Sequence, residues 1–200
     1  MSRAHDVRWF DPRGMRDEAI LQLATGRDVL LRQLLDAIHE RLVQPGTLSH
    51  WLLTGNRGAG KSFFLRLLQA HFAAHFAGRA RFVLLPEEHS NIFAAHEFLA
   101  ETERMLSVEQ GATGAPPSWK VSQPDAAWTQ ALDSLLAAFS EPLLVIGVEN
   151  FDQLLEQAFT DDADNARLRH LMSNQPRLML VATAVHGHFD EQYHQRLFRQ

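Results

Sequence analysis

The feature that most constrains the fold is a glycine-rich octet between an apolar segment and a helix-like one. The octet reads Gly55, Asn56, Arg57, Gly58, Ala59, Gly60, Lys61 and Ser62, and it matches G-x-x-x-x-G-K-[ST] at every fixed position. Residues 50–54 read as a short buried strand, and residues 63–72 carry helical periodicity. Strand, loop and helix in this order predict a phosphate-binding loop rather than a chance glycine-rich turn. We assign the octet and the next residue, Phe63, to a nucleotide site.

The residue types in this octet suit a polyphosphate. Backbone N–H groups must wrap the anion, so the loop needs residues without bulk that tolerate unusual φ/ψ angles, and Gly55, Gly58 and Gly60 supply them. A helix beginning at about Lys61 would face the anion with its amides and its dipole. We expect Lys61 to reach the β- and γ-phosphates and the Ser62 hydroxyl to bind Mg²⁺. The expected cofactors are therefore ATP and Mg²⁺.

Composition limits the class of protein. Two hundred residues at 46% apolar suit one globular α/β domain with a sizeable core. The sequence has no cysteine, which excludes disulfides and thiolate metal sites and fits a reducing cytoplasm. No apolar run reaches the roughly 18 residues of a membrane helix, and the start lacks the apolar core of a signal peptide. We expect a cytoplasmic protein without a membrane partner.

Net charge bears on the partners. At −5 the chain has no global basic field, so charge does not indicate nucleic acid, although a local basic patch stays open. Beside the nucleotide itself, we expect a protein partner or self-association.

The other apolar segments alternate between strand-like and helix-like patterns. Strands are expected at 50–54, 81–85, 143–148 and 178–182, and helices within 16–42 (broken at 25–28), then at 61–77, 92–106, 128–139, 152–159 and 161–173. Continuous apolar strands between helices predict a mainly parallel sheet covered by helices on both faces. Together with the phosphate-loop pattern, this α/β arrangement resembles the three-layer α/β/α sandwich of P-loop NTPases. We divide the chain into an N-terminal helical segment, 1–46, and a core, 47–200, within one α/β domain overall. Residues 107–126 form a long, weakly structured loop that is functional or mobile.

A bound Mg²⁺ also needs a carboxylate, by way of water, from the end of a neighbouring strand. The apolar strand 143–148 is followed by Glu149, Asn150, Phe151 and Asp152. We therefore assign Ser62 and Glu149 as the metal-binding residues.

With these residues in place, the chain resembles P-loop ATPases of the AAA+ and STAND kind, over roughly residues 20–190. Residues 25–28 resemble the "GR" box of origin-recognition-type and STAND ATPases, which implies that Arg27 lies near the adenine. Residues 178–183 resemble the sensor-1 strand, with Thr183 at its polar position, which implies that Thr183 contacts the nucleotide. The resemblance implies an origin-recognition-like bacterial ATP-binding protein. Because the chain ends soon after this strand, without a helical lid or a sensor-2 arginine, we expect part of a longer protein or a truncated one.

One departure from these families concerns the catalytic base. They usually follow the metal ligand with an acid, but Asn150 stands there, and an amide cannot accept a proton from water. Asp152 is one candidate base, although it could instead cap the following helix. Glu87 and Glu88 are the preferred candidates, since they end strand 81–85 much as the catalytic glutamate does in recombinase- and clock-type ATPases. We expect that strand to lie beside the phosphate loop in the sheet and favour Glu88; the alternative is that both are solvated acids.

Histidines offer a second, weaker set of candidates among eleven copies. His71 and His75 are four residues apart on one predicted helix face, the spacing of a zinc pair, but no third ligand is evident, which favours surface or packing roles. His186 and His188 follow the sensor-like strand and could approach a γ-phosphate.

Two functions from different classes fit this sequence. One is an ATPase that couples Mg²⁺-dependent hydrolysis to a conformational change. The other is a switch or scaffold module that binds nucleotide and hydrolyses it slowly or not at all. A small-molecule kinase is disfavoured because the sequence shows no arginine-rich lid segment.

Overall fold

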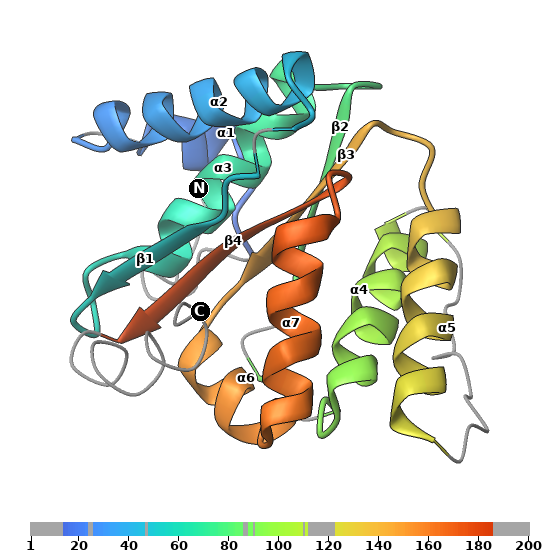
Figure 1. The fold of residues 1–200 in the computed structure, drawn as a ribbon. Coiled ribbons are helices and arrows are strands. Elements are labelled where there is room, and N and C mark those ends of the chain that lie inside the picture. The colour runs from blue at the N-terminus through green and yellow to red at the C-terminus, as the bar shows by residue number, and fades with distance from the viewer. Residues whose placement is uncertain are drawn as a thin grey trace.

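The computed structural model describes residues 14–23, 26–46, 48–85, 88–89, 91–109, 111 and 123–185. The strands are β1 (Trp51–Gly55), β2 (Ala80–Leu84), β3 (Leu143–Val148) and β4 (Leu178–Val185). They form one sheet in the order β1-β4-β3-β2, and every neighbouring pair is parallel (Figure 1). The parallel α/β fold predicted from the sequence is confirmed.

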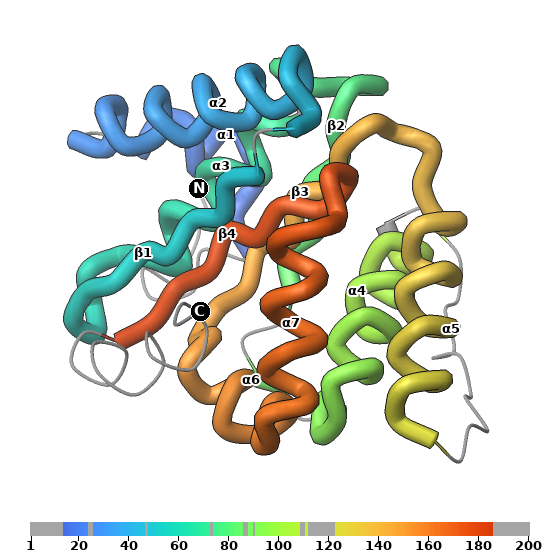
Figure 2. Tube along the Cα trace, in the orientation of Figure 1, coloured from blue at the N-terminus to red at the C-terminus, as the bar shows by residue number. Residues whose placement is uncertain are grey.

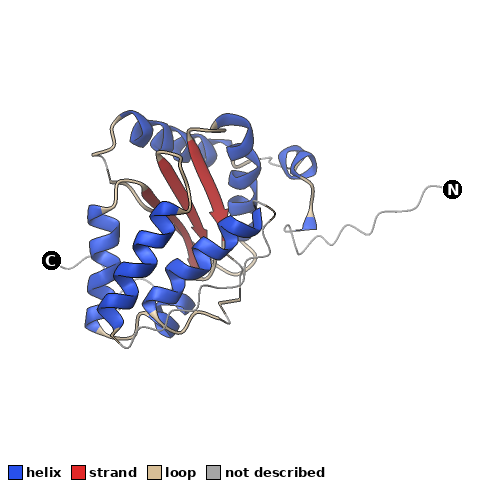
Figure 3. Cartoon of the chain, turned by 90° about the vertical axis from the view of Figure 1, so that its right-hand side faces the viewer, coloured by secondary structure: helices blue, strands red, loops and turns tan. Residues whose placement is uncertain are grey.

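Helices cover both faces of this sheet. They are α1 (Asp17–Gln22), α2 (Asp28–Val43), α3 (Lys61–His75), α4 (Ala95–Glu109), α5 (Pro124–Ala137), α6 (Phe151–Ala158) and α7 (Asp162–Asn174). One hydrophobic cluster joins α1, α2 and α3 to one face of the sheet, and a second joins α4, α5, α6 and α7 to the other. In the side view the strands lie between helices (Figure 3), which gives the three layers expected. Within the described ranges, no helix is both long and apolar enough to cross a bilayer.

The order of the strands follows from their burial. Every residue of β3 is buried, and so is every residue of β4 except the last. Strands of this kind need neighbours on both edges and helices on both faces, so they take the centre of the sheet. The outer places, within the described residues, go to β1 and β2.

This order corrects one expectation. We predicted that the strand ending before Glu87 and Glu88 lies beside the phosphate-loop strand. In the structure β2 is the strand farthest from β1, because β3 and β4 lie between them. Proximity in the sequence was a poor guide here, since a parallel sheet does not require successive strands to be neighbours.

Some element boundaries also differ from prediction. Helix α4 begins at Ala95 rather than at 92, because the Glu97 carboxylate accepts hydrogen bonds from the N–H groups of Phe93 (2.7 Å) and Ala94 (3.0 Å) and so caps the helix there. Helix α5 begins at Pro124, in the first turn, where a missing N–H costs nothing. The loop predicted at 107–126 is therefore helical at 107–109 and 124–126, and residues 110 and 112–122 lie outside the described ones.

Strand β4 is longer than predicted. It continues past Ala182 to Val185, because its last residues pair with β1 as far as Gly55. Figure 2 shows the two strands side by side along their length. Their shared carboxyl end is thus the start of the glycine-rich loop.

Two side chains, Arg41, which is buried, and His50, which is half-buried, link the elements at the amino end of the sheet. Arg41, 2% exposed, donates hydrogen bonds to the carbonyl oxygens of Ser49 (2.7 Å), Gln175 (3.2 Å), Pro176 (3.4 Å) and Leu178. His50 donates from Nε2 to the Met172 carbonyl (2.7 Å) and accepts at Nδ1 from the Leu180 N–H (3.0 Å). Together they tie α2, β1, α7 and β4.

Candidate nucleotide-binding site

The glycine-rich loop connects β1 to α3 at the carboxyl end of the sheet. Gly58 (φ +80°) and Gly60 (φ +79°) are both in the left-handed region, which residues with a side chain rarely adopt. Residues 56–59 are exposed, so a ligand has access to them. Helix α3 starts directly after the loop, with Phe64 N–H donating to the Gly60 carbonyl at 3.0 Å, and the amides of its first turn have no partner within the helix. The local geometry is that of an anion-binding helix start.

Arg27 lies against the backbone of this loop. Its Nη1 donates to the Gly60 carbonyl (2.6 Å) and its Nη2 to the Ala59 carbonyl (3.3 Å), and the guanidinium lies 5.0 Å from the centre of the Phe63 ring. The C=O and N–H of a trans peptide point in opposite directions. The N–H groups of Gly60 and Lys61 therefore point away from Arg27. A Cβ at Gly60 would lie 1.9 Å from Arg27 Nη2, a second reason for glycine there.

The lysine of the loop is folded onto the loop itself. Lys61 Nζ donates to the carbonyls of Gly55 (2.6 Å) and Asn56 (3.0 Å). Its positive charge thus lies against the first residues of the loop.

The two residues assigned to the metal meet. Ser62, on the first turn of α3, donates a hydrogen bond from Oγ to Oε2 of Glu149, which follows β3 and is 1% exposed. These residues are 87 positions apart in the chain. One hydroxyl and one carboxylate fit Mg²⁺, which usually takes one or two carboxylates and completes its shell with phosphate oxygens and water. Among the described residues, no group of three or more His, Cys, Asp or Glu side chains is arranged to hold a metal ion.

The backbone turns sharply after Glu149. Asn150 has φ +47° and is the only non-glycine residue with positive φ among those described; it is the residue before α6. Its N–H donates to Thr183 Oγ1 (3.3 Å), and the Glu149 carbonyl faces His89 Nε2 at 2.7 Å. Thr183, placed at the sensor position by resemblance, is 2% exposed and contacts the Asn150 N–H.

The candidate bases occupy different environments. Asp152 is 7% exposed; its Oδ2 accepts from the Val185 N–H at 3.5 Å, and its Oδ1 has no hydrogen-bond partner in the described part of the chain. Val185 pairs with Gly55, so this carboxylate lies one strand from the start of the loop. It is not the N-cap of α6, a position taken by Asn150. Glu88 is exposed and follows the far strand β2, and Glu87 lies outside the described residues.

His89 is a buried residue of this site that the sequence did not single out. It is 5% exposed, and because a carbonyl only accepts hydrogen bonds, Nε2 carries the proton and donates to Glu149. Burial lowers the pKa of His89, although the bond to Glu149 and the charges of Asp152 and Glu101 act in the opposite direction. The ring is therefore neutral near pH 7. In the sequence His89 directly follows two glutamates, and nothing in that context indicates a bond to Glu149.

The other histidine candidates gain no support. The rings of His71 and His75 stack with centres 5.5 Å apart, and burial together with the charge of His75 lowers the pKa of His71. No third ligand joins them within the described residues. His186 and His188 lie outside those residues.

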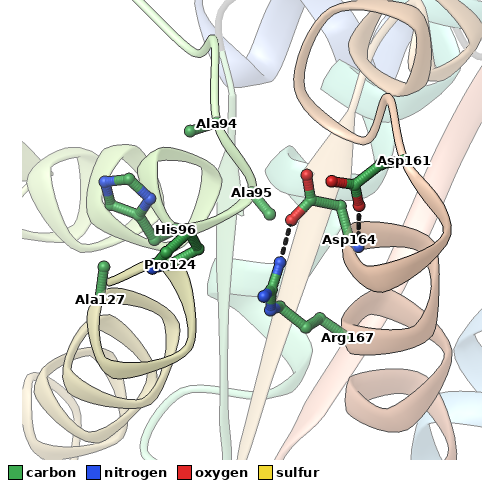
Figure 4. Close-up of a pocket in the computed structure, with 8 residues that line it drawn as sticks. All are labelled: Ala94, Ala95, His96, Pro124, Ala127, Asp161, Asp164 and Arg167. Carbon is green, nitrogen blue, oxygen red and sulfur yellow. Dashed lines mark hydrogen bonds and ion pairs between the residues drawn. The ribbon is translucent and has the colours of Figure 1, made fainter. Parts of the chain in front are cut away.

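A cavity of about 250 Å³ lies elsewhere, between the first turns of α4, α5 and α7 (Figure 4). None of its lining residues belongs to the loop. Its polar groups bind each other: Arg167 pairs with Asp164 and, through Nε at 3.0 Å, with Asp125, while Asp161 accepts from the Asp164 N–H at 2.7 Å. This cavity is thus a structural junction separate from the loop site.

Comparison with known proteins supports the fold. No family model matches the sequence, and no curated protein matches it. The structure resembles that of the ORC2 protein of Aeropyrum pernix, with a TM-score of 0.54 and 14% identity. The similarity covers 95% of this chain and 48% of that one, so the chain spans about half the length of the ORC2 chain. The chain has the P-loop NTPase fold.

Two further solved structures are less similar. A chain of Drosophila ORC bound to DNA has a TM-score of 0.45 at 16% identity, covering 92% of this chain and 86% of that one. A Walker-type ATPase of Pyrococcus abyssi has a TM-score of 0.42 at 16% identity, covering 79% and 44%. The fold assignment therefore rests on the ORC2 similarity and on the site geometry.

Proposed function

We propose that this chain is a Mg²⁺-dependent ATP-binding module of the AAA+ and STAND type that hydrolyses ATP and couples hydrolysis to a conformational change. The observation that carries the proposal is the contact between Ser62 and Glu149, which brings the hydroxyl of the phosphate loop to a buried carboxylate at the end of β3. The Aeropyrum pernix ORC2 structure, which has this fold, is described as ADPNP–ADP complexes.

Each residue has a distinct task in this proposal. The amides of the glycine-rich loop and of the first turn of α3 hold the phosphates, and Lys61 moves from the loop carbonyls to the β- and γ-phosphates. Arg27 and Phe63 support the loop from the other side. Ser62 and Glu149 hold Mg²⁺, which when bound neutralises charge developing on the phosphates.

For the proton acceptor, the structure favours Asp152 over Glu88. Asp152 lies buried in the first turn of α6, in contact with Val185 at the end of β4. One of its oxygens has no hydrogen-bond partner in the described residues. Glu88 is exposed beside the far strand, so it reaches the loop only if its segment moves.

Asn150 favours a second candidate function, a nucleotide-dependent switch. Its amide cannot act as a base, and it stands where an acid usually follows the metal ligand. In this alternative the chain binds nucleotide, turns it over slowly or not at all, and signals to a protein partner or to a second copy. A cytoplasmic location fits the cysteine-free sequence in either case.

Titration calorimetry with ATP and ADP, with and without Mg²⁺, tests binding. Lys61→Ala is expected to abolish it, because the loop loses its fixed positive charge on the phosphates. Arg66→Ala is the matched control, since Arg66 lies on the same helix but is tied to α1 through Asp17 Oδ1 (2.5 Å). Unchanged affinity in Lys61→Ala contradicts the nucleotide site.

Turnover measured on the same proteins separates the two functions. Asp152→Asn is expected to lower ATP hydrolysis about 10²–10⁴-fold with binding intact, and Glu88→Gln to leave it near the parent rate. The reverse result assigns the base to Glu88. Tight binding by a parent chain without turnover selects the switch.

A further inference from the structure

One peptide unit next to the metal-binding carboxylate is held at both of its polar atoms. The carbonyl of the Glu149–Asn150 peptide accepts from His89 Nε2 (2.7 Å), and its N–H donates to Thr183 Oγ1 (3.3 Å). His89 follows β2, and Thr183 belongs to β4. These strands are the two neighbours of β3, so the turn after β3 is held by hydrogen bonds from both sides.

Fixing this peptide fixes the direction of Glu149. A trans peptide is a rigid plane, whose orientation here sets the ψ angle of Glu149 and the φ angle of Asn150. Asn150 has φ +47°, a value that an unsupported chain rarely keeps. The Cα atom of Glu149 lies at one corner of this plane, and the side chain extends from it to Ser62. A rotation of the plane would carry the carboxylate away from the loop.

His89 is itself held in place. It is 5% exposed, and its own carbonyl accepts from Gln157 Nε2 on α6 at 3.0 Å. Helix α6 begins at Phe151, directly after the Glu149–Asn150 peptide. The imidazole thus belongs to a closed set of contacts that joins the segment after β2, the turn after β3 and α6.

We propose that His89 and Thr183 are positioning residues for the metal site, which hold the Glu149–Asn150 peptide so that Glu149 meets Ser62 and a Mg²⁺–nucleotide. This role rests on the proposed function. Both residues act through Glu149. The hydroxyl of Thr183 therefore serves the backbone of the metal ligand, a role different from the nucleotide contact that resemblance suggests.

Two pairs of variants test this role. His89→Gln retains an N–H donor near the place of Nε2, whereas His89→Ala removes it. Thr183→Ser retains the hydroxyl, whereas Thr183→Val removes it with almost no change in shape. His50→Ala is the control, since His50 is a half-buried histidine that donates from Nε2 to a carbonyl over the same 2.7 Å, at the opposite end of the sheet.

The first readout is a Mg²⁺ titration of the chain saturated with ADP. We expect the Mg²⁺ concentration at half-saturation to rise about 10–100-fold in His89→Ala and Thr183→Val, the usual loss when a group supporting a metal ligand is removed. The affinity for ADP in EDTA should stay at the parent value. His89→Gln and Thr183→Ser should restore most of the Mg²⁺ affinity, and His50→Ala should leave it unchanged.

The second readout needs no ligand. Hydrogen exchange of the Asn150 amide, followed by NMR in the nucleotide-free chain, should be slow in the parent and faster in His89→Ala and Thr183→Val. A parent chain without Mg²⁺-dependent ADP binding overturns the proposed function, and the positioning role with it. A parent with that binding, together with variants whose Mg²⁺ affinity is unchanged, overturns the positioning role alone. Loss of Mg²⁺ affinity in His50→Ala to the same degree also overturns it.

Discussion

The polar side chains at the two ends of the sheet differ in how completely they are hydrogen-bonded. At the amino end, each nitrogen of the Arg41 guanidinium donates to a carbonyl, and both ring nitrogens of His50 are bonded. At the carboxyl end, His89 Nδ1 and Asp152 Oδ1 are buried without a hydrogen-bond partner in the described residues. The backbone strain at Asn150 lies at this end too.

This difference separates an end with a structural role from the end where we propose the nucleotide site. A buried polar atom without a partner costs stability, so folded proteins rarely keep one without a reason. At the amino end the bonds of Arg41 and His50 join four elements. At the carboxyl end, His89 bonds the carbonyl of Glu149, the residue whose carboxylate we assign to Mg²⁺, and Asn150 directly follows it. Removing groups from each end should therefore affect different properties.

The largest effect is expected from Arg41→Ala. The change leaves several carbonyl oxygens buried without their donor, each of which costs about 1–3 kcal/mol, so we expect a loss of about 3 kcal/mol or more in unfolding free energy. Arg32→Ala, an exposed position on the same helix, is the control and should change stability by less than about 0.5 kcal/mol. Urea unfolding measures both. A small loss in Arg41→Ala would show that the amino end is not the structural anchor.

The next effect concerns pH. Burial lowers the pKa of His50 to about 4, with the bond to Met172 acting against it and the charge of Arg41 adding to it. Between pH 6.5 and about 4 the unfolded chain takes up a proton that the folded chain does not, so stability falls as pH falls through this window. The full loss is about 3 kcal/mol.

His50→Gln isolates this contribution, since glutamine does not titrate. Urea midpoints at pH 7.5 and 4.5 should fall less in the variant than in the parent. Equal falls would mean that His50 is already protonated in the folded chain, and that the amino end is less completely buried than its contacts indicate.

The smallest effect tests the strain at the carboxyl end. Asn tolerates the left-handed conformation better than most residues, and glycine adopts it freely. Asn150→Gly should therefore change the unfolding free energy by a few tenths of a kcal/mol, whereas Asn150→Ala should cost about 1 kcal/mol. Thermal unfolding of the two variants side by side measures the difference. Equal stability of both would remove the conformational reason for asparagine here.

The left-handed conformation also gives a structural reason for asparagine at position 150, where an acid was expected. In the sequence, Asn150 reads as the loss of a catalytic base. In the structure it is the residue whose backbone turns from β3 into α6, with its N–H bonded to Thr183. Glutamate at this position would regain a carboxylate but would have to adopt a conformation that it disfavours.

Local patterns determined the elements of this protein. The glycine-rich octet, the apolar runs of β3 and β4 and the acidic end of β3 are contiguous in the chain, so periodicity and turn chemistry were enough to predict them, and the contact of Ser62 with Glu149 followed from the strand ends. Contacts between distant segments decided the rest. The order of the strands, which separates β2 from the loop, depends on which strands are buried on all sides, and no window of sequence contains that information. The bond from His89 to Glu149 likewise forms only when 60 residues of chain fold back to bring β2 beside β3. The contacts of Asn150 with Thr183 and of Asp152 with Val185 need β4 beside β3.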